Sequence, residues 1–278
     1  FAYGSYNSNF LAIQSFLIRK NINFLIEHFE RYDREVMQEF NLHDAIIFYQ
    51  MFHQFVLNLS GNSEDILVLK GRVFDELQII PIWIKAEDIS LTVFYSKKAM
   101  LSYLFGDKKD AFNYFEKSMP FMDLLVGMML VPEFNFFHSL TCLALLHSED
   151  YTNLKKSYID EIKSNQEKMK IWGENCPANY GHKYHIVEGE WAAIHGDVVG
   201  VIEHFNKAIV LAKEHEYLFE EAIANEVFAE FWEKQENESL AKTCRIEAHY
   251  AYLKWGCIPK CEQLEEAYPY LKRKQYQS

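Results

Sequence analysis

The sequence predicts an all-α protein, a right-handed superhelix (an α-solenoid) of antiparallel helix pairs stacked along the chain. The first observation is composition: 49% of the 278 residues are hydrophobic, whereas the chain has only 11 Gly and 6 Pro. So few turn-forming residues favour long helices over many short strands. The second observation is a pattern of turn, small and aromatic residues that recurs every 40 to 45 positions, as helical repeats require.

The recurring pattern is clearest in two stretches. Each has a Gly-Asp turn, a small or β-branched residue five positions after the glycine, and a phenylalanine nine positions after it. In a helix pair the turn separates two helices, the small residue lets them approach, and the aromatic ring fills the space to the next pair. These positions are Gly106, Ala111 and Phe115 in one stretch, and Gly196, Val201, Phe205 and Ala208 in the other.

Three other parts of the chain fit the same frame. The match is good near the C-terminus, weak around residue 66, and partial at the start of the chain, where only the buried positions can be aligned. The matching residues are Glu236, Ala241 and Ala248; Gly61, Ile66 and Val73; and Leu25, Phe29 and Tyr32.

The position nine residues after each turn sets the number of repeats. It falls at residues 29, 70, 115, 205 and 245, so the steps are 41, 45, 90 and 40. Because 90 is two steps of 45, we expect one further unit centred near Ile162. The prediction is about six helix pairs in a single domain over residues 1–278, weaker in 1–160 and clearest in 160–272, with the shape of a superhelical rod.

These offsets are similar to those of tetratricopeptide repeats, although the period exceeds the usual ~34 residues. In such repeats the first helix carries a closely packed small residue before the turn. Gly189 stands seven positions before Gly196, and Ala99 stands seven before Gly106. The longer period implies longer helices or loops than in the usual repeat.

A more specific resemblance is carried by four stretches: LSYLFGDKKDAFNYFEKS, NQEKMKIWGENCPANYGHKYHIVEGEWAAIHGD, NKAIVLAKEHEYLFEEAIANEVFAEFW and AHYAYLKWGCIPKCEQLEEAYP. They resemble the helical-repeat region of large bacterial signalling proteins, in which a serine/threonine kinase domain and an AAA-type ATPase are followed by tetratricopeptide-like repeats, a GAF domain and a histidine kinase. The resemblance covers most of the chain and is strongest over residues 160–272. It implies a connector or sensor segment of a longer protein, with no catalytic residues of its own.

Charge and cysteine content exclude several classes of protein. The net charge of −12 disfavours nucleic-acid binding, which depends largely on Lys and Arg. The five cysteines are irregularly spaced and form no C-x-x-C pair, so neither a disulfide framework nor a zinc knuckle is indicated. We expect a reducing, cytoplasmic location. The cysteines are Cys142, Cys176, Cys244, Cys257 and Cys261.

The most apolar run, at 121–137, does not predict a membrane helix. Asp123, Pro132 and Glu133 interrupt it, so it falls short of the roughly 20 apolar residues that a bilayer requires. The chain opens at Phe1 with no charged region before an apolar stretch, so a secretory signal is not expected.

One stretch, WGENCPANYGHKYHIVEGE at 172–190, gathers residue types that can ligate a metal. His182, His185 and Glu188 step by three along a predicted helix, and Cys176 could reach back over the same turn. In the family that the chain resembles, the position of His185 is usually aromatic or aliphatic. A metal site needs a fixed ligand set with supporting contacts. We therefore expect repeat architecture here and assign no catalytic, cofactor-binding or metal-ligating residue.

The structural interpretation of this stretch is the entry to a helix. Asn175 or Asn179 would be the N-cap, with Pro177 in the first turn. His182 would have a capping or a buried hydrogen-bonding role. Packing would come from Tyr184, Ile186 and Val187.

Enzymatic chemistry finds little support in the chain. Neither G-x-x-x-x-G-K-[ST] nor G-x-G-x-x-G occurs, which disfavours phosphate binding, and H-R-D and D-F-G are both absent. A Cys/His nucleophile is open on counts alone, but a lone cysteine in a helical pattern is usually a small buried hydrophobe. An enzyme is the third hypothesis.

The aromatic content, 16% of residues, has two interpretations. Most of these rings would fill the layers between repeats, but some could line a concave groove. The first functional hypothesis is a non-catalytic protein-interaction and signal-relay module in a multidomain sensor kinase. Its partners would be peptides or protein domains, mainly neighbours in the same chain, with self-association possible and no cofactor. The alternative is a ligand-sensing domain that encloses a small molecule and changes curvature.

Overall fold

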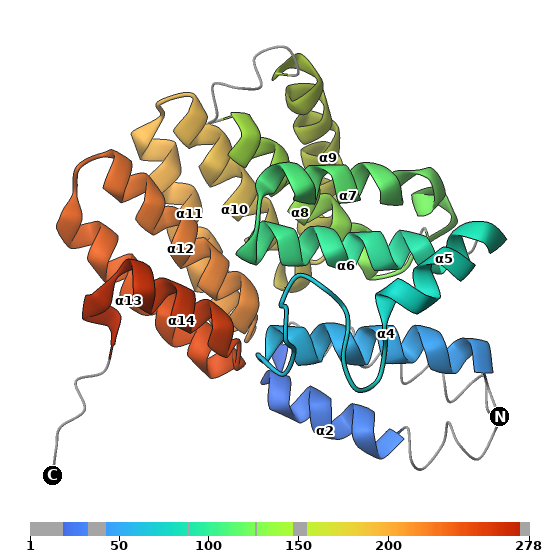
Figure 1. Cartoon of the computed structure of the whole chain (residues 1–278). Coiled ribbons are helices and arrows are strands. Elements are labelled where there is room, and N and C mark those ends of the chain that lie inside the picture. Colours follow the sequence, from blue (N-terminus) through green and yellow to red (C-terminus); the bar gives the residue numbers. More distant parts are fainter. Residues whose placement is uncertain (1–18, 33–42, 88, 126, 147–154, 273–278) are drawn as a thin grey trace, which may run out of the picture.

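The prediction of an all-α protein is confirmed by the computed structural model, which describes residues 19–32, 43–87, 89–125, 127–146 and 155–272. These residues form twelve α-helices, two 3₁₀ turns and no strand (Figure 1). The helices are α2 (Ile22–Tyr32), α4 (His43–Leu59), α5 (Glu76–Ala86), α6 (Ser90–Phe105), α7 (Lys108–Ser118), α8 (Leu130–Leu146), α9 (Lys155–Asn175), α10 (Pro177–Ile194), α11 (Val198–Glu214), α12 (Leu218–Lys234), α13 (Glu238–Trp255) and α14 (Ile258–Ala267), with 3₁₀ turns η2 (Met119–Leu125) and η4 (Pro269–Leu271).

The predicted close-approach and filler positions are buried. Helix α6 packs on α7, α10 on α11, and α12 on α13. In each second helix the position five after the turn has no exposed surface, and the same holds for both phenylalanines nine after it. The further unit expected near Ile162 is α9, which packs on α8 and buries that isoleucine. The fully buried positions are Ala111, Phe115, Val201, Phe205, Ala208, Ala241 and Ala248, and in α2 Leu25 and Phe29.

Left-handed residues between the C-terminal helices explain the long period. Residues 196, 216, 236 and 256 all have positive φ, at 72°, 60°, 56° and 96°. They stand 20 residues apart, so one helix and its turn occupy 20 residues and a pair occupies 40. Helices of 17 or 18 residues are therefore what lengthens the repeat.

Polar side chains begin three of the second helices. Asp107 accepts the N–H of Lys109, Asp197 accepts that of Gly200, and Asn237 accepts that of Leu240. Each of these N-caps follows the turn residue of the repeat frame directly. The Gly-Asp turn in the sequence is thus a helix end followed by a helix start.

The weak repeat at residues 61–73 is wrong. Residues 60–75 form a compact loop before α5, where the frame required a helix. Asn58, buried at the end of α4, donates to the carbonyls of Asp65, Ile66 and Val68 at 3.2, 3.1 and 2.7 Å. These bonds satisfy three backbone oxygens that a helix would otherwise pair, and the Leu69 amide is satisfied by the Glu76 carboxylate.

The chain curves so that its first described helices lie beside its last ones. Figure 1 shows α2 and α4 beside α13 and α14. Asn21, before α2, donates to the carbonyl of Lys254 at 2.9 Å, and Lys260 in α14 donates to that of Leu104 at 2.9 Å.

Aromatic rings fill the inside of this curve. Tyr103 of α6 contacts Phe137 of α8, with ring centroids 5.6 Å apart. Phe137 stacks on Phe219 of α12 at 5.7 Å, and Phe219 stacks on Trp255 of α13 at 4.2 Å. This series joins α6, α8, α12 and α13, which belong to three different helix pairs. These rings therefore form part of the core on the inside of the curve.

Candidate functional site

The four candidate ligands of the 172–190 stretch diverge in the structure. Cys176 is the N-cap residue of α10, and the ring of His182 is fully buried. The Nδ1 atom of His185 lies 2.8 Å from that of His204, and Glu188 accepts a hydrogen bond from Gln166. Within the described ranges, no group of three or more His, Cys, Asp or Glu side chains could hold a metal ion.

The predicted helix entry is correct in Pro177 but wrong in its cap. Pro177 is the first residue of α10, and Cys176 makes no side-chain cap bond. Asn175 instead donates to the carbonyl of Ile171, and Asn179 accepts from the hydroxyl of Tyr217. Proline at the first helical position leaves one fewer amide for a cap to satisfy.

The buried hydrogen-bonding role expected for His182 is confirmed. Its Nε2 lies 3.3 Å from Nζ of Lys183, and its ring lies against that of Tyr217, with centroids 4.2 Å apart. When Lys183 is protonated it can only donate, so in that state Nε2 is the acceptor and Nδ1 carries the ring proton. That buried Nδ1 has no hydrogen-bond partner.

Two buried ion pairs cross the inner side of the curve. Lys97 of α6 pairs with Glu133 of α8, with 2.7 Å between Nζ and Oε2. Lys183 of α10 pairs with Glu220 of α12, and both of these side chains are at most 5% exposed. Buried ion pairs cost desolvation free energy that their attraction barely repays. Apolar residues would hold these helices together as well, so the charges favour a functional interpretation of this region.

Burial sets the protonation of two groups at this site. It lowers the pKa of Lys183 to about 7, against the opposing effect of the Glu133 carboxylate. It also lowers the pKa of His182 well below its usual value, and the Lys183 charge adds to that shift. The imidazole is therefore neutral at pH 7, in keeping with its role as acceptor.

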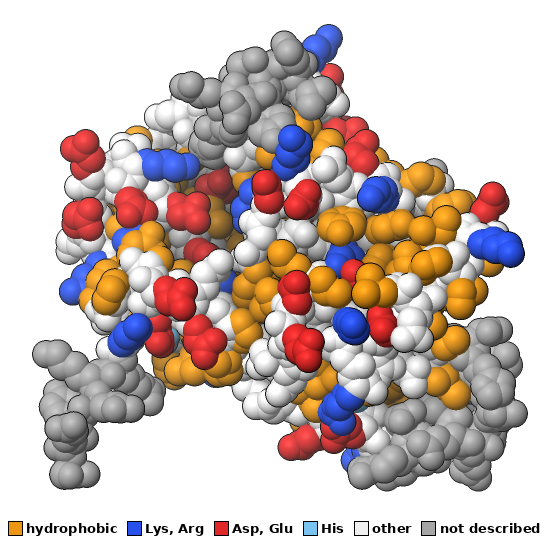
Figure 2. Space-filling view, viewed as in Figure 1, with side chains coloured by type: hydrophobic (Ala, Val, Ile, Leu, Met, Phe, Trp, Pro, Cys, Tyr) orange, Lys and Arg blue, Asp and Glu red, His pale blue; other side chains and the backbone are white. Residues whose placement is uncertain are grey.

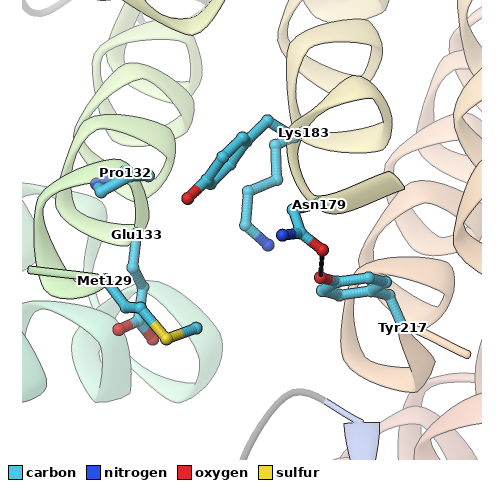
Figure 3. Close-up of a pocket in the computed structure, with 7 residues that line it drawn as sticks. Met129, Pro132, Glu133, Asn179, Lys183 and Tyr217 are labelled. Carbon is cyan, nitrogen blue, oxygen red and sulfur yellow. Dashed lines mark hydrogen bonds between the residues drawn. The ribbon is translucent and has the colours of Figure 1, made fainter. Parts of the chain in front are cut away.

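A small pocket opens beside Lys183, and we call it the Lys183 pocket. Its walls come from α8 and the residue before it, from α10, and from the residue before α12 (Figure 3). The volume is about 40 Å³, and the lining residues are Met129, Pro132, Glu133, Asn179, Tyr180, Lys183 and Tyr217. Lys183 points into the pocket, while Tyr217 donates to the Asn179 oxygen at 2.7 Å. The guanidinium of Arg19 lies 4.7 Å from the Tyr217 ring centroid.

A larger groove adjoins this pocket, and we call it the methionine groove. It has a volume of about 830 Å³ and runs between the η2–α8 segment and helices α9 and α10. It shares Met129, Pro132 and Tyr180 with the Lys183 pocket. Its other apolar walls are Met119, Met122, Met128, Val131, Phe134 and Trp172, and its polar edge is Asn135, Glu161, Ser164, Asn165 and Lys168.

The outer surface carries a second apolar feature. Figure 2 shows hydrophobic side chains over the α5–α7 side and acidic side chains over α11–α13. In α5, Leu77 is 64% exposed and Ile82 is 62% exposed. Exposed apolar patches mark interaction surfaces. The methionine groove is the stronger candidate because a concave site buries more of a ligand and here adjoins convergent polar groups.

Sequence reasoning missed the charged residues of this site. Glu133 stands in an apolar run, and Lys97 and Glu220 lie within α6 and α12, each followed by a mostly apolar stretch. A charge surrounded by hydrophobic residues is a usable signal for a buried pair, but its partner is 36 or 37 residues away in sequence. Only the stacking of the helices brings the partners together.

Comparisons with protein-family models, with curated proteins and with solved structures each found no match to this chain. Among the residues that the structure describes, no helix is both long enough and apolar enough to cross a membrane.

Proposed function

We propose that this chain is a non-catalytic protein-interaction and signal-relay module, which presents the methionine groove to a peptide or to a neighbouring domain of the same protein. The observation that supports it is the lining of that groove, where four methionines stand beside Phe134, Trp172 and Tyr180. In this proposal the helix pairs form a right-handed, tetratricopeptide-like superhelix of about six pairs. The wider setting would be a cytoplasmic multidomain sensor kinase.

Methionine and aromatic side chains suit a surface that accepts different partners. Methionine is unbranched and polarisable, so it can repack around side chains of several shapes. Trp172 and Tyr180 supply the large rigid contacts that dominate interface energies. The fitting ligand is the apolar face of an amphipathic helix or extended segment, and Glu161 and Lys168 lie at the groove edge to meet its polar residues.

The test uses a model amphipathic helix of Leu, Glu and Lys with zero net charge, so that the net charge of the chain does not drive binding. Binding is followed by tryptophan fluorescence. We expect a saturable change that is lost in Trp172→Phe, since that indole lines the groove. Met128→Glu should weaken binding at least about tenfold, or ~1.4 kcal/mol.

The matched control is Val210→Glu, which adds the same charge at a position that is 60% exposed on α11. It should change the affinity less than about twofold, because surface substitutions away from an interface stay within ~0.5 kcal/mol. Equal effects of Met128→Glu and Val210→Glu would exclude the groove as the binding surface.

A ligand-sensing domain is the second candidate. It is favoured by the Lys183 pocket, where buried charges converge on a small cavity. A ligand there would contact α8 and α10, so binding could change how these helices pack. A rise in melting temperature with a small molecule, in the absence of any peptide, would favour this candidate over the first.

A further inference from the structure

The Lys183 pocket presents hydrogen-bonding atoms of both kinds on opposite sides. Oε1 of Glu133 is buried and has no hydrogen-bond partner. Lys183 directs two of its three N–H bonds to Glu220 and His182, which leaves one donor for the pocket. The Asn179 oxygen is occupied by Tyr217, and the Asn179 nitrogen faces the Lys183 side (Figure 3). A bound group would therefore meet an acceptor on one side and two donors on the other.

We infer that this pocket binds a primary carboxamide, the side chain of a Gln or Asn in the segment that docks in the methionine groove. The inference rests on the proposed function. The amide oxygen would accept from Lys183 and Asn179, while the amide nitrogen would donate to Oε1 of Glu133. Oε1 of Glu133, which is buried without a partner, thus gains a donor, and the third N–H of Lys183 gains an acceptor.

Charged groups fit the pocket less well. A carboxylate would satisfy the two donors but would place its second oxygen against the Glu133 carboxylate. An ammonium would satisfy Glu133 but, while Lys183 is protonated, would lie against the charge of that lysine. Like charges brought together away from water are strongly unfavourable. A neutral group with both a donor and an acceptor avoids both conflicts.

The size of the pocket agrees with this group. A volume of about 40 Å³ corresponds to roughly three water-sized positions, and a carboxamide has three heavy atoms. Since Met129, Pro132 and Tyr180 line both spaces, the chain that carries the amide can continue directly into the groove.

The experiment compares hexanamide, hexanoate, hexylammonium and 1-hexanol, which share an apolar chain and differ in the polar end. Binding is measured by NMR on protein labelled at the methionine methyl groups. The chain has eight methionines, of which Met129 reports on both spaces and Met119 and Met122 report on the groove alone. The buried Met51 and Met100 serve as internal references.

We expect hexanamide to shift Met129 with a Kd at least about tenfold below those of the two charged probes. Glu133→Gln removes the charge but keeps an acceptor for Lys97. Hexanoate should therefore bind this variant more tightly, and the ratio of its Kd to that of hexanamide should fall below about three. Asn179→Ala should weaken hexanamide several-fold. Glu203→Gln, on the exposed face of α11, should leave every ratio unchanged.

Equal binding of all four probes would overturn the carboxamide inference and leave the groove intact as a binding surface. The carboxamide inference is also overturned if the ratio of the hexanoate Kd to the hexanamide Kd is unchanged in Glu133→Gln. It is overturned as well if the amphipathic helix shifts the NMR signals of the groove methionines while hexanamide shifts none. If neither the helix nor hexanamide shifts them, both the inference and the proposed function are wrong.

Discussion

The ring of Phe205 lies against the backbone of Gly189, so that a Cβ at Gly189 would stand 2.8 Å from Cε2 of the ring. Phe205 has no room to withdraw, because it is fully buried and stacks on Phe228 with centroids 5.0 Å apart. The small residue of one helix and the filler of the next are therefore a single contact. The fixed spacing of small and aromatic residues in the repeats reflects this contact.

The first prediction concerns this contact. Gly189→Ala should destabilise the fold, by about 1–3 kcal/mol for overpacking, even though alanine favours helix. Gly173→Ala is the matched control, since its Cβ would meet Gly181 at an ordinary 3.7 Å. It should stabilise α9 by up to ~1 kcal/mol. Urea unfolding measures both, and a Gly189→Ala protein as stable as the parent would contradict the frame.

The second prediction concerns the filler itself. Phe205→Ala should cost roughly 3–5 kcal/mol, because truncation of this fully buried ring leaves a cavity in the layer between helices. Ala111→Trp should also destabilise its helix pair, since Ala111 has no exposed surface. Val210→Ala, on the exposed face of α11, should stay within ~0.5 kcal/mol. Segment-resolved hydrogen exchange is the measurement, because loss in a repeat array can be local. Unchanged protection in α10–α12 of Phe205→Ala would reject this account of the layer.

The third prediction concerns the caps. Asp197→Ala should cost about 1 kcal/mol, since it removes the acceptor of the Gly200 amide at the start of α11. Asp197→Ser should keep most of that stability, and Glu203→Ala in the same helix should change little. A loss in Asp197→Ser as large as in Asp197→Ala would show that the cap bond is not the cause.

The fourth prediction is a loss of stability in acid. Burial lowers the pKa of His138 from 6.5 to about 4, and His53 and His185 are lowered similarly. The unfolded chain therefore binds protons between pH 6.5 and pH 4 that the folded chain excludes. Stability is fully present above pH 6.5 and falls as the pH drops toward 4, by up to about 3 kcal/mol for His138 alone.

The test of this pH dependence is the slope of unfolding free energy against pH. His138→Gln should flatten the slope between pH 6.5 and pH 4, whatever its effect on stability at neutral pH. His195→Gln, at an exposed position, should leave the slope unchanged. An identical slope in both variants would exclude His138 as a source of acid sensitivity.

Local pattern was enough to predict much of the fold. Ala111 and Val201 each occur at a fixed offset from a turn. Their burial depends only on the helix geometry within one pair. The same offset failed at Gly61, because the Asn58 side chain replaces helical hydrogen bonds with its own. A loop held by hydrogen bonds from a side chain to backbone carbonyls produces no periodic pattern in the sequence.

The site was harder to predict because its parts are distant in sequence. The His182–Glu188 stretch attracted attention for its residue types, yet its side chains face different neighbours. Lys183, between the two candidate histidines, is the residue that faces the pocket. Its ion-pair partner Glu220 and the other pocket carboxylate, Glu133, lie 37 and 50 positions away, and which helices meet on the inner side depends on how the chain curves.

The most direct test of the account is hydrogen exchange of the chain with and without the amphipathic helix of Leu, Glu and Lys. If the methionine groove is the binding surface, added protection should be concentrated in residues 119–146 and in α9 and the first turns of α10. Helices α13 and α14, which lie outside the groove, should exchange as in the free protein. Protection that instead appeared over α5, or uniformly over the chain, would contradict the assignment of the groove.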